Sequence, residues 1–209
     1  MIAILDYGVG NLFSLRSSLQ QLGLQAVVTA DADTLRAADR LILPGVGAFG
    51  DAMAKLTATG LVPVLKEQAE EKPLLGICLG MQLLFEKSYE YGEHAGLGFI
   101  KGEVCPLGPD LADKGLKVPQ MGWNQVFPTS PNGVRHPMWE GIPDGAYFYF
   151  VHSFYAQPAD PVHCAAETDY GGRFASAVAR DKIFATQFHP EKSADHGLAL
   201  YRNFLHWNP

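Results

Sequence analysis

The sequence has few cysteines and no long apolar run, and each shortage excludes a class of protein. Its three cysteines, at positions 78, 105 and 164, form no CxxC pair and are too few for a disulfide framework, so we expect a reducing compartment. No apolar run approaches the roughly 20 residues that span a bilayer, and the start MIAILDYG lacks the basic flank of a signal peptide. The sequence therefore predicts a cytoplasmic protein without membrane contact.

Basic charge is also scarce. Lys and Arg number 16 against 22 Asp and Glu, a net charge of -6, so we expect no nucleic-acid partner. The 7 histidines show neither HExxH nor HxH spacing, and we expect no metal and no cofactor. Hydrophobic residues make up 47% of the 209 residues, and no linker or repeat interrupts them, which predicts one domain spanning 1–209.

The N-terminal part alternates short apolar runs with helical patterns, as βα units on a parallel sheet do. Strands are expected at residues 2–5, 25–29, 40–43 and 73–77, and helices at 12–22 and 62–71. Beyond Gly98, frequent proline, glycine and aromatic residues favour mixed or antiparallel strands, among them 147–151 and a hairpin of 174–179 with 183–188. A helix at about 194–205 closes the chain. The expected fold class is α/β, a central, mostly parallel sheet flanked by helices, with an antiparallel, strand-rich second half.

Cys78 differs from the other two cysteines, which we expect to be structural. The segment Gly76-Ile77-Cys78-Leu79-Gly80 has the form of a nucleophile elbow, in which a sharp turn from strand to helix lifts the nucleophile above the sheet edge. A helix over 81–85 would follow, and its N-terminus would favour the thiolate. The alternative from this pentapeptide alone is a buried structural cysteine.

His189-Pro190-Glu191 supplies a candidate base with its orienting carboxylate. In an extended segment, residues i and i+2 share a face, and the intervening proline favours extended geometry at His189. Glu191 would then reach the imidazole, as in the base half of a catalytic triad. Taken alone, a histidine at a strand end is more often structural.

Pro44-Gly45-Val46-Gly47 is a glycine turn at the end of another expected strand. Its backbone N–H groups, with that of Leu79, would form an oxyanion hole for acyl transfer. Residues 45–50 also match GxGxxG, but no acidic residue closes a second strand about 20 residues later, which argues against NAD binding.

Three spaced segments, PGVGAFG at 44–50, GICLGMQLLFE at 76–86 and FHPEKS at 188–193, resemble those of class I glutamine amidotransferases. The further segments DYGVGN at 6–11, GLGFIKG at 96–102, VPQMGWN at 118–124 and YFVHSF at 149–154 are similar to the glutaminase subunits of imidazole glycerol phosphate synthase. The resemblance covers essentially the whole length.

This resemblance implies specific roles for individual residues. Cys78, His189 and Glu191 would be the catalytic triad, and Gly45, Val46 and Gly47, with Leu79, the oxyanion hole. Gln82, Glu90, Ser153 and Phe154 would hold L-glutamine; many relatives carry tyrosine at the last position, which leaves a main-chain contact there. Asn11, Trp123, Tyr149 and Lys192 would lie at or near the surface that meets the partner.

The resemblance also implies a reaction and a partner. Glutamine would be hydrolysed through a cysteine thioester, and ammonia would pass to a cyclase partner, which is a (β/α)8 barrel, in a heterodimer that forms imidazole glycerol phosphate and AICAR in histidine biosynthesis. Because the Val46 peptide lies between glycines and can rotate, we expect the isolated chain to be slow until the cyclase binds. Three alternatives remain: a glutaminase of another synthase, a binding module without catalysis, and a cysteine peptidase or γ-glutamyl hydrolase.

Overall fold

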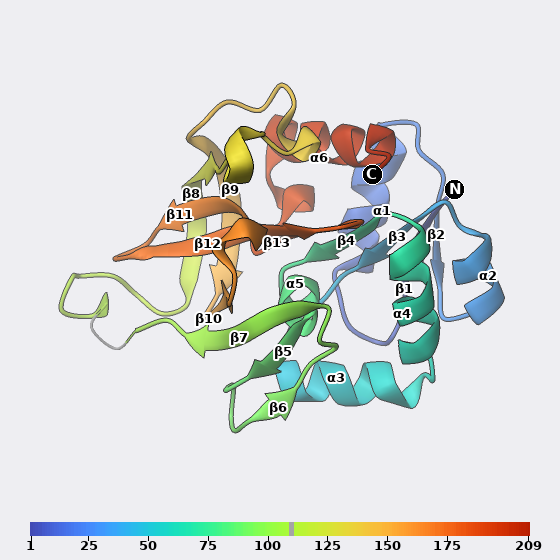
Figure 1. Cartoon of the computed structure of the whole chain (residues 1–209), viewed down its shortest axis with the longest axis horizontal. Helices are drawn as coiled ribbons and strands as arrows, with labels where there is room; N and C mark the ends of the chain where they lie inside the picture. The colour runs from blue at the N-terminus through green and yellow to red at the C-terminus, as the bar shows by residue number, and fades with distance from the viewer. Residues whose placement is uncertain (109–110) are drawn as a thin grey trace.

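The structure, a computed structural model, describes residues 1–108 and 111–209, which form two sheets flanked by helices (Figure 1). The larger sheet runs, in spatial order, β2 (Ala26–Thr29), β1 (Ile2–Leu5), β3 (Arg40–Leu43), β4 (Leu74–Ile77), β13 (Ile183–Thr186), β12 (Arg173–Arg180), β11 (Cys164–Asp169), β8 (Gln120–Pro128) and β9 (Ala146–His152). The first five strands are mutually parallel, and the later ones join antiparallel. The predicted α/β architecture is confirmed.

A smaller sheet is built from β10 (Phe154–Pro158), β7 (Ile100–Pro106), β5 (Phe85–Ser88) and β6 (His94–Ala95). Helices cover both faces of the larger sheet. On one face lie α1 (Leu12–Gln21) and α6 (Ala194–His206); on the other lie α2 (Ala32–Ala37), α3 (Phe49–Ala58) and α4 (Val62–Glu71) (Figure 1). Every residue of β1, β3, β4 and β13 is buried, because parallel strands are covered on both sides.

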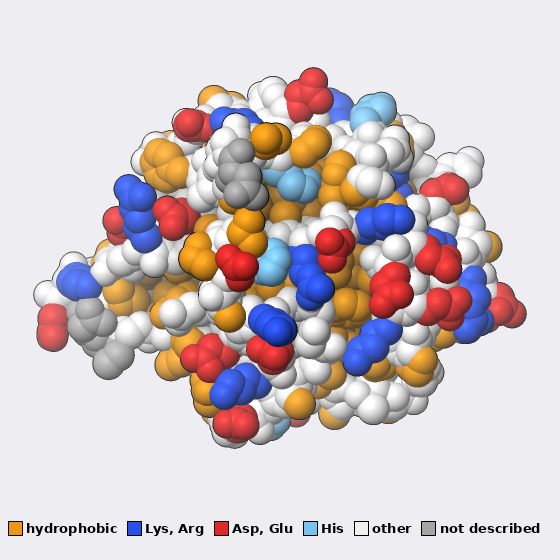
Figure 2. All heavy atoms as spheres, viewed as in Figure 1, with side chains coloured by type: hydrophobic (Ala, Val, Ile, Leu, Met, Phe, Trp, Pro, Cys, Tyr) orange, Lys and Arg blue, Asp and Glu red, His pale blue; other side chains and the backbone are white. Residues whose placement is uncertain are grey.

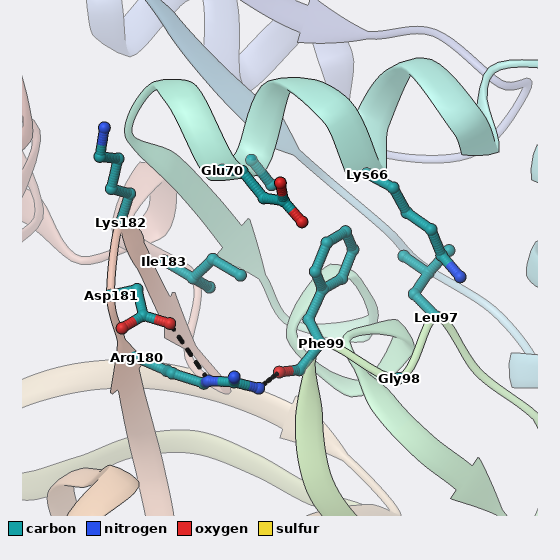
Figure 3. Close-up of a pocket in the computed structure, with 10 residues that line it drawn as sticks. Lys66, Glu70, Leu97, Gly98, Phe99, Arg180, Asp181, Lys182 and Ile183 are labelled. Atoms are coloured by element: carbon teal, nitrogen blue, oxygen red, sulfur yellow. Dashed lines mark hydrogen bonds and ion pairs between the residues drawn. The ribbon is translucent and has the colours of Figure 1, made fainter.

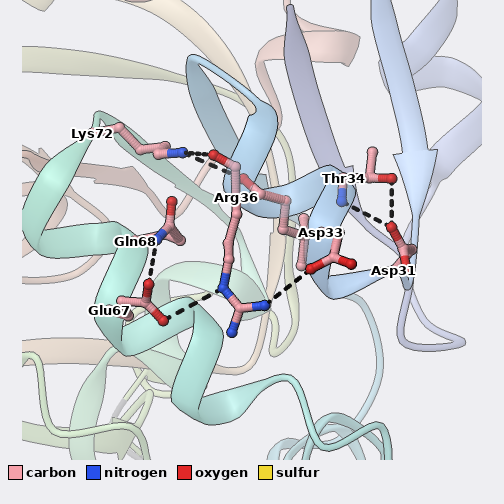
Figure 4. Close-up of polar contacts among 8 residues, drawn as sticks. Asp31, Asp33, Thr34, Arg36, Glu67, Gln68 and Lys72 are labelled. Carbon is pink, nitrogen blue, oxygen red and sulfur yellow. Dashed lines mark hydrogen bonds and ion pairs between the residues drawn. The ribbon is translucent and has the colours of Figure 1, made fainter.

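The short helix α2 buries Leu35 in the core, and polar contacts hold both of its ends (Figure 4). The side chain of Asp31 accepts from Thr34 N at 2.8 Å and caps its start. Lys72 Nζ donates to the carbonyls of Arg36 and Ala38, each at 2.7 Å, and so satisfies the open end of the helix. A helix of six residues that depends on a distant lysine has little local signal, and it was not predicted from the sequence.

Two further elements differ from expectation. The helix expected at 81–85 is α5 (Leu79–Leu83), because the turn at Cys78 starts it two residues earlier, and Phe85 already belongs to β5. α3 was not predicted, since the glycines at 45, 47 and 50 suggest a loop. The hairpin of β12 and β13 is confirmed, with Asp181 at φ 51° in its turn.

The order of the strands brings the candidate residues to one edge. β4 and β13 are parallel neighbours in which Thr186 pairs with Ile77, so the segments after both strands emerge together. Cys78 follows β4 and His189 follows β13. No helix in the described part of the chain is long and apolar enough to cross a membrane. Figure 2 shows acidic and basic side chains interspersed over one face, so this face carries no basic tract.

Candidate active site

Cys78 lies on a strained turn between β4 and α5. Its φ of 54° and ψ of −113° are rare for a residue with a side chain, and strain of this kind is concentrated at functional sites. Its backbone N–H donates to Thr186 O at 2.7 Å, which ties the turn to β13. A Cβ at Gly80 would lie 1.9 Å from Leu43 O, so the structure requires glycine on this side of the elbow.

His189 and Glu191 form a buried pair. Nδ1 of His189 lies 2.8 Å from Glu191 Oε1, and the two side chains are 2% and 4% exposed. Because the carboxylate accepts, Nδ1 carries a proton and Nε2 is the nitrogen that remains for chemistry. Nε2 is buried and has no hydrogen-bond partner among the described residues.

The expected extended backbone through this pair is wrong. Only His189 is extended, at φ −101° and ψ 98°, whereas Pro190–Lys192 form a 3-10 turn, η5. Proline suits the first position of a helical turn as well as an extended chain, because its fixed φ is common to both. Ser193 stabilises the turn by donating to His189 O at 2.6 Å. The side chains of His189 and Glu191 contact each other across this turn.

The electrostatics of His189 are set by opposing effects. Burial disfavours the charged imidazolium, but the negative charge of Cys78 and the bonds and charge of Glu191 outweigh burial and raise the pKa of His189 to about 10. His189 therefore holds its second proton beside Cys78, where an imidazolium can serve as the proton donor in cysteine chemistry.

A cavity of about 290 Å³ opens beside these residues. Its lining includes most of the predicted substrate and oxyanion residues: Val46, Gly47, Leu79, Gln82, Glu90, Ser153 and Phe154, together with Cys78 and His189. Gly45 lies in an adjoining small cavity with Asn11 and Glu191. A Cβ at Gly45 would lie 2.8 Å from Gly80 N, so this turn packs directly on the elbow. The N–H of Leu79, as the first of α5, has no acceptor within the helix.

Two of the predicted substrate residues are already engaged with protein groups. Glu90 Oε2 accepts from Phe49 N at 2.6 Å and caps α3, whose own cap residue provides no side-chain acceptor. Gln82 Nε2 donates to Phe154 O at 3.0 Å. His152 Nδ1 lies 2.7 Å from the same carbonyl, and burial lowers the pKa of His152 to about 4, which keeps its ring neutral.

The four residues expected near a partner separate into two places. Trp123 and Tyr149 form an edge-on aromatic pair with centroids 6.1 Å apart, and Lys192 Nζ lies 5.5 Å from the Tyr149 ring centroid. Asn11 instead caps α1, with its side chain accepting from Ser14 N at 3.4 Å. The aromatic pair is connected to the segment of His189, because His189 N donates to Tyr149 O at 2.9 Å and Tyr149 N donates to Ser193 Oγ at 3.0 Å.

Ser193 and Gln187 both contact this site, and neither was predicted from the sequence. Ser193 lies within the FHPEKS segment, where its small hydroxyl gives no signal of its own. Gln187 Nε2 lies 3.7 Å from Cys78 Sγ and is fully buried. The only signal for Gln187 in the sequence is that it is a polar residue at the end of an apolar strand.

A larger cavity, of about 570 Å³, lies at the opposite end of β13 (Figure 3). It is lined by Phe99, Arg180 and Ile183 among others, and Arg180 is held there by Asp181 at 3.2 Å. None of the predicted site residues lines it. The smaller cavity is therefore the candidate active site. In the described ranges, no group of three or more His, Cys, Asp or Glu side chains is arranged to hold a metal ion.

Known proteins are similar to this chain in sequence and in fold. Residues 3–207 match the family "Glutamine amidotransferase class-I". The imidazole glycerol phosphate synthase subunit HisH of Methylococcus capsulatus is 51% identical over 213 residues, covering 100% of this chain and 97% of its own. That of Sulfurimonas denitrificans is 49% identical, covering 98% and 97%.

Among solved structures, PurLQS of Thermotoga maritima has a TM-score of 0.73 at 19% identity, and the match covers 98% of this chain and 97% of that one, a likeness of fold alone. The match of the family over nearly the whole length, with two relatives near half identical, leads to one conclusion: the chain belongs to the class I glutamine amidotransferases.

Proposed function

We propose that this chain is the glutaminase subunit of an imidazole glycerol phosphate synthase and acts in the cytoplasm as a single domain spanning 1–209. Two relatives of nearly equal length bear that subunit's name. The observation that carries the chemistry is the buried contact of His189 with Glu191 at 2.8 Å, in a cavity that also contains the strained Cys78. These are the parts of a nucleophile, base and orienting carboxylate.

In this proposal, the Cys78 thiolate attacks the side-chain amide carbon of glutamine and forms a tetrahedral oxyanion. His189 donates the proton from Nε2 to the departing nitrogen, and ammonia leaves as the carbon–nitrogen bond breaks. A glutamyl thioester remains on Cys78. His189, now neutral, removes a proton from water, which attacks the thioester, releases glutamate and restores the thiolate.

The oxyanion is stabilised by backbone donors of the Gly45-Val46-Gly47 turn and of Leu79, which lie around the same cavity. Gln82, Glu90, Ser153 and Phe154 hold the substrate. A single amino acid suits a cavity of about 290 Å³, which is at the small end for ligand sites. This size favours free glutamine over the longer substrate of a cysteine peptidase or γ-glutamyl hydrolase.

The partner, a cyclase chain in a heterodimer, is proposed to bind the face of β8 and β9 that carries Trp123 and Tyr149. Trp123 is 52% exposed and Met121 65%, and large exposed apolar side chains gathered on one face mark interaction surfaces. Through Tyr149 and Ser193, this face contacts the backbone of His189 directly.

Substitution of Cys78 by alanine tests the proposal. Glutamine hydrolysis by the purified complex should fall to the uncatalysed background, while the thermal midpoint of unfolding changes little. Cys164→Ala, which removes a thiol outside this cavity, is the matched control and should retain activity. Ammonia release by Cys78→Ala at the wild-type rate would remove Cys78 from the mechanism, and a γ-glutamyl peptide cleaved faster than glutamine would favour a peptidase.

A further inference from the structure

Gln187 is a fully buried amide beside the nucleophile and does not line the substrate cavity. It follows β13, and its backbone N–H donates to Ser176 O at 2.9 Å, which fixes the residue on the sheet. A buried side-chain amide that made no hydrogen bond would be costly, so its orientation is determined by its partners.

Those partners connect the substrate cavity to the sulfur. Gln82 Nε2 donates both to Phe154 O and to Gln187 Oε1, each at 3.0 Å. A primary amide has two N–H groups, and both are now used. Because Gln187 Oε1 faces Gln82, its own Nε2 must face the other way, where it lies 3.7 Å from Cys78 Sγ.

We propose that Gln187 is a positioning residue. Gln82 fixes the orientation of the Gln187 amide, and this amide in turn donates to the Cys78 thiolate. The proposal deepens the glutaminase assignment and rests on Cys78 being its nucleophile. The donor at Nε2 stabilises negative charge on sulfur, and the contact with Gln82 prevents the amide from turning its oxygen toward that charge.

The same geometry assigns a chemical preference to Gln82. Since its two N–H groups are taken by protein acceptors, the atom left for a ligand is Oε1, which accepts hydrogen bonds. An acceptor at this position suits the α-ammonium group of an amino acid. A ligand bound there stabilises the amide that orients Gln187, so substrate binding and thiolate stabilisation support each other.

The test is the pH dependence of iodoacetamide alkylation of Cys78 in the full chain, followed by peptide mass spectrometry. This experiment measures the nucleophile without requiring turnover, so it remains informative if the glutaminase assignment fails. Gln187→Met keeps the length and loses the donor, and the midpoint of the profile should rise by about one pH unit, the order expected for one hydrogen bond to a charged atom.

Gln82→Met should shift the midpoint in the same direction by less, and the double variant should match Gln187→Met alone, because Gln82 acts only through Gln187. Ser176→Ala, which removes a buried hydroxyl on the neighbouring strand, is the control and should leave the profile unchanged. The proposal is overturned if a folded Gln187→Met variant gives the wild-type profile, or if the two single shifts add.

Discussion

Glu191 is placed so that its charge acts on two neighbours. It holds Nδ1 of His189, and it also lies near the hydroxyl of Tyr201, a fully buried side chain. Burial first, and then the charge of Glu191, raise the pKa of Tyr201 well above its usual value, so the phenol stays protonated. The carboxylate therefore remains the acceptor of this cluster and maintains the proton on Nδ1.

Glu191→Gln should consequently impair the rate more than the binding of glutamine. An amide presents either an oxygen or an NH2 group to Nδ1, and the second choice selects the wrong tautomer of His189. We expect kcat to fall on the order of 10²-fold or more, with KM changed much less. Steady-state kinetics of the complex measure both constants. A raised KM with an unchanged kcat would instead place Glu191 in substrate binding.

At the scale of elements, His136 caps the start of the 3-10 helix η3 (Pro137–Trp139). Its Nδ1 accepts from Met138 N at 3.2 Å, and its ring packs 4.9 Å from Phe184 and 5.0 Å from Trp207, measured between centroids. An accepting nitrogen must be unprotonated, and burial lowers the pKa of His136 to about 4.

Stability should therefore fall on acidification. Above the unfolded pKa of about 6.5, both states are neutral; between about 6.5 and 4 the unfolded chain binds a proton that the folded chain does not. When the unfolded chain takes up that proton fully, the free energy of unfolding changes by about 1.4 kcal/mol per pH unit. Urea unfolding at several pH values measures it. The buried His152, whose pKa is also lowered to about 4, contributes a second proton to the same slope. His136→Asn, which keeps an acceptor, should therefore reduce the slope by about 1.4 kcal/mol per pH unit, and the exposed His206→Asn should leave it unchanged. Equal slopes in all three proteins would show that His136 does not contribute.

Elements with strong periodicity or buried apolar runs were predictable, and those fixed by distant partners were not. β1, β3 and β4 follow from runs of buried residues, and the elbow follows from its glycines. The end of α2 depends on Lys72, which is distant in sequence, and the 3-10 turn at Pro190–Lys192 was missed because proline suits an extended chain as well as a helical turn. Cys78, His189 and Glu191 could be proposed from the sequence because an elbow and an HPE segment each carry a chemical motif. Gln187 was missed because its contacts, with Gln82 and Cys78, are to residues distant in sequence.

At the scale of the molecule, the main chain of β9 connects the proposed partner surface to the proposed triad. β9 presents Tyr149 beside Trp123, and the main-chain atoms of Tyr149 bond to His189 and Ser193. The turn that carries Val46, which is 41% exposed, ends at Gly47 with φ 96°. We expect a partner that binds this face to act on the His189 backbone through Tyr149, and the Val46 turn borders the same cavity as His189.

We expect the isolated chain to hydrolyse glutamine at least about tenfold more slowly than the complex with cyclase ligand, a barrier difference of about 1.4 kcal/mol. The physical reason is that the peptide at Val46 rotates cheaply between glycines and donates inward only when the partner favours that state. Turnover of the chain, the complex and the liganded complex measures this. Equal rates in all three would show a site that is always assembled.

Trp123→Ala should remove the activation by weakening the complex. An exposed tryptophan at the centre of an interface typically contributes about 2 kcal/mol or more. Val134→Ala is the matched control, since Val134 is 70% exposed and lines a cavity beside Arg180, away from Trp123. The alkylation profile of Cys78 should be the same in both variants.

The close approach of Gly80 to Leu43 has a consequence for protein engineering. The collision falls on the first side-chain atom, so no choice of rotamer at position 80 relieves it, and the neighbour is a backbone carbonyl that cannot turn aside. The elbow is therefore not a portable loop. A designer who grafts residues 76–80 onto another scaffold must also transfer the end of β3 and keep its position relative to the turn, because the turn packs against that strand.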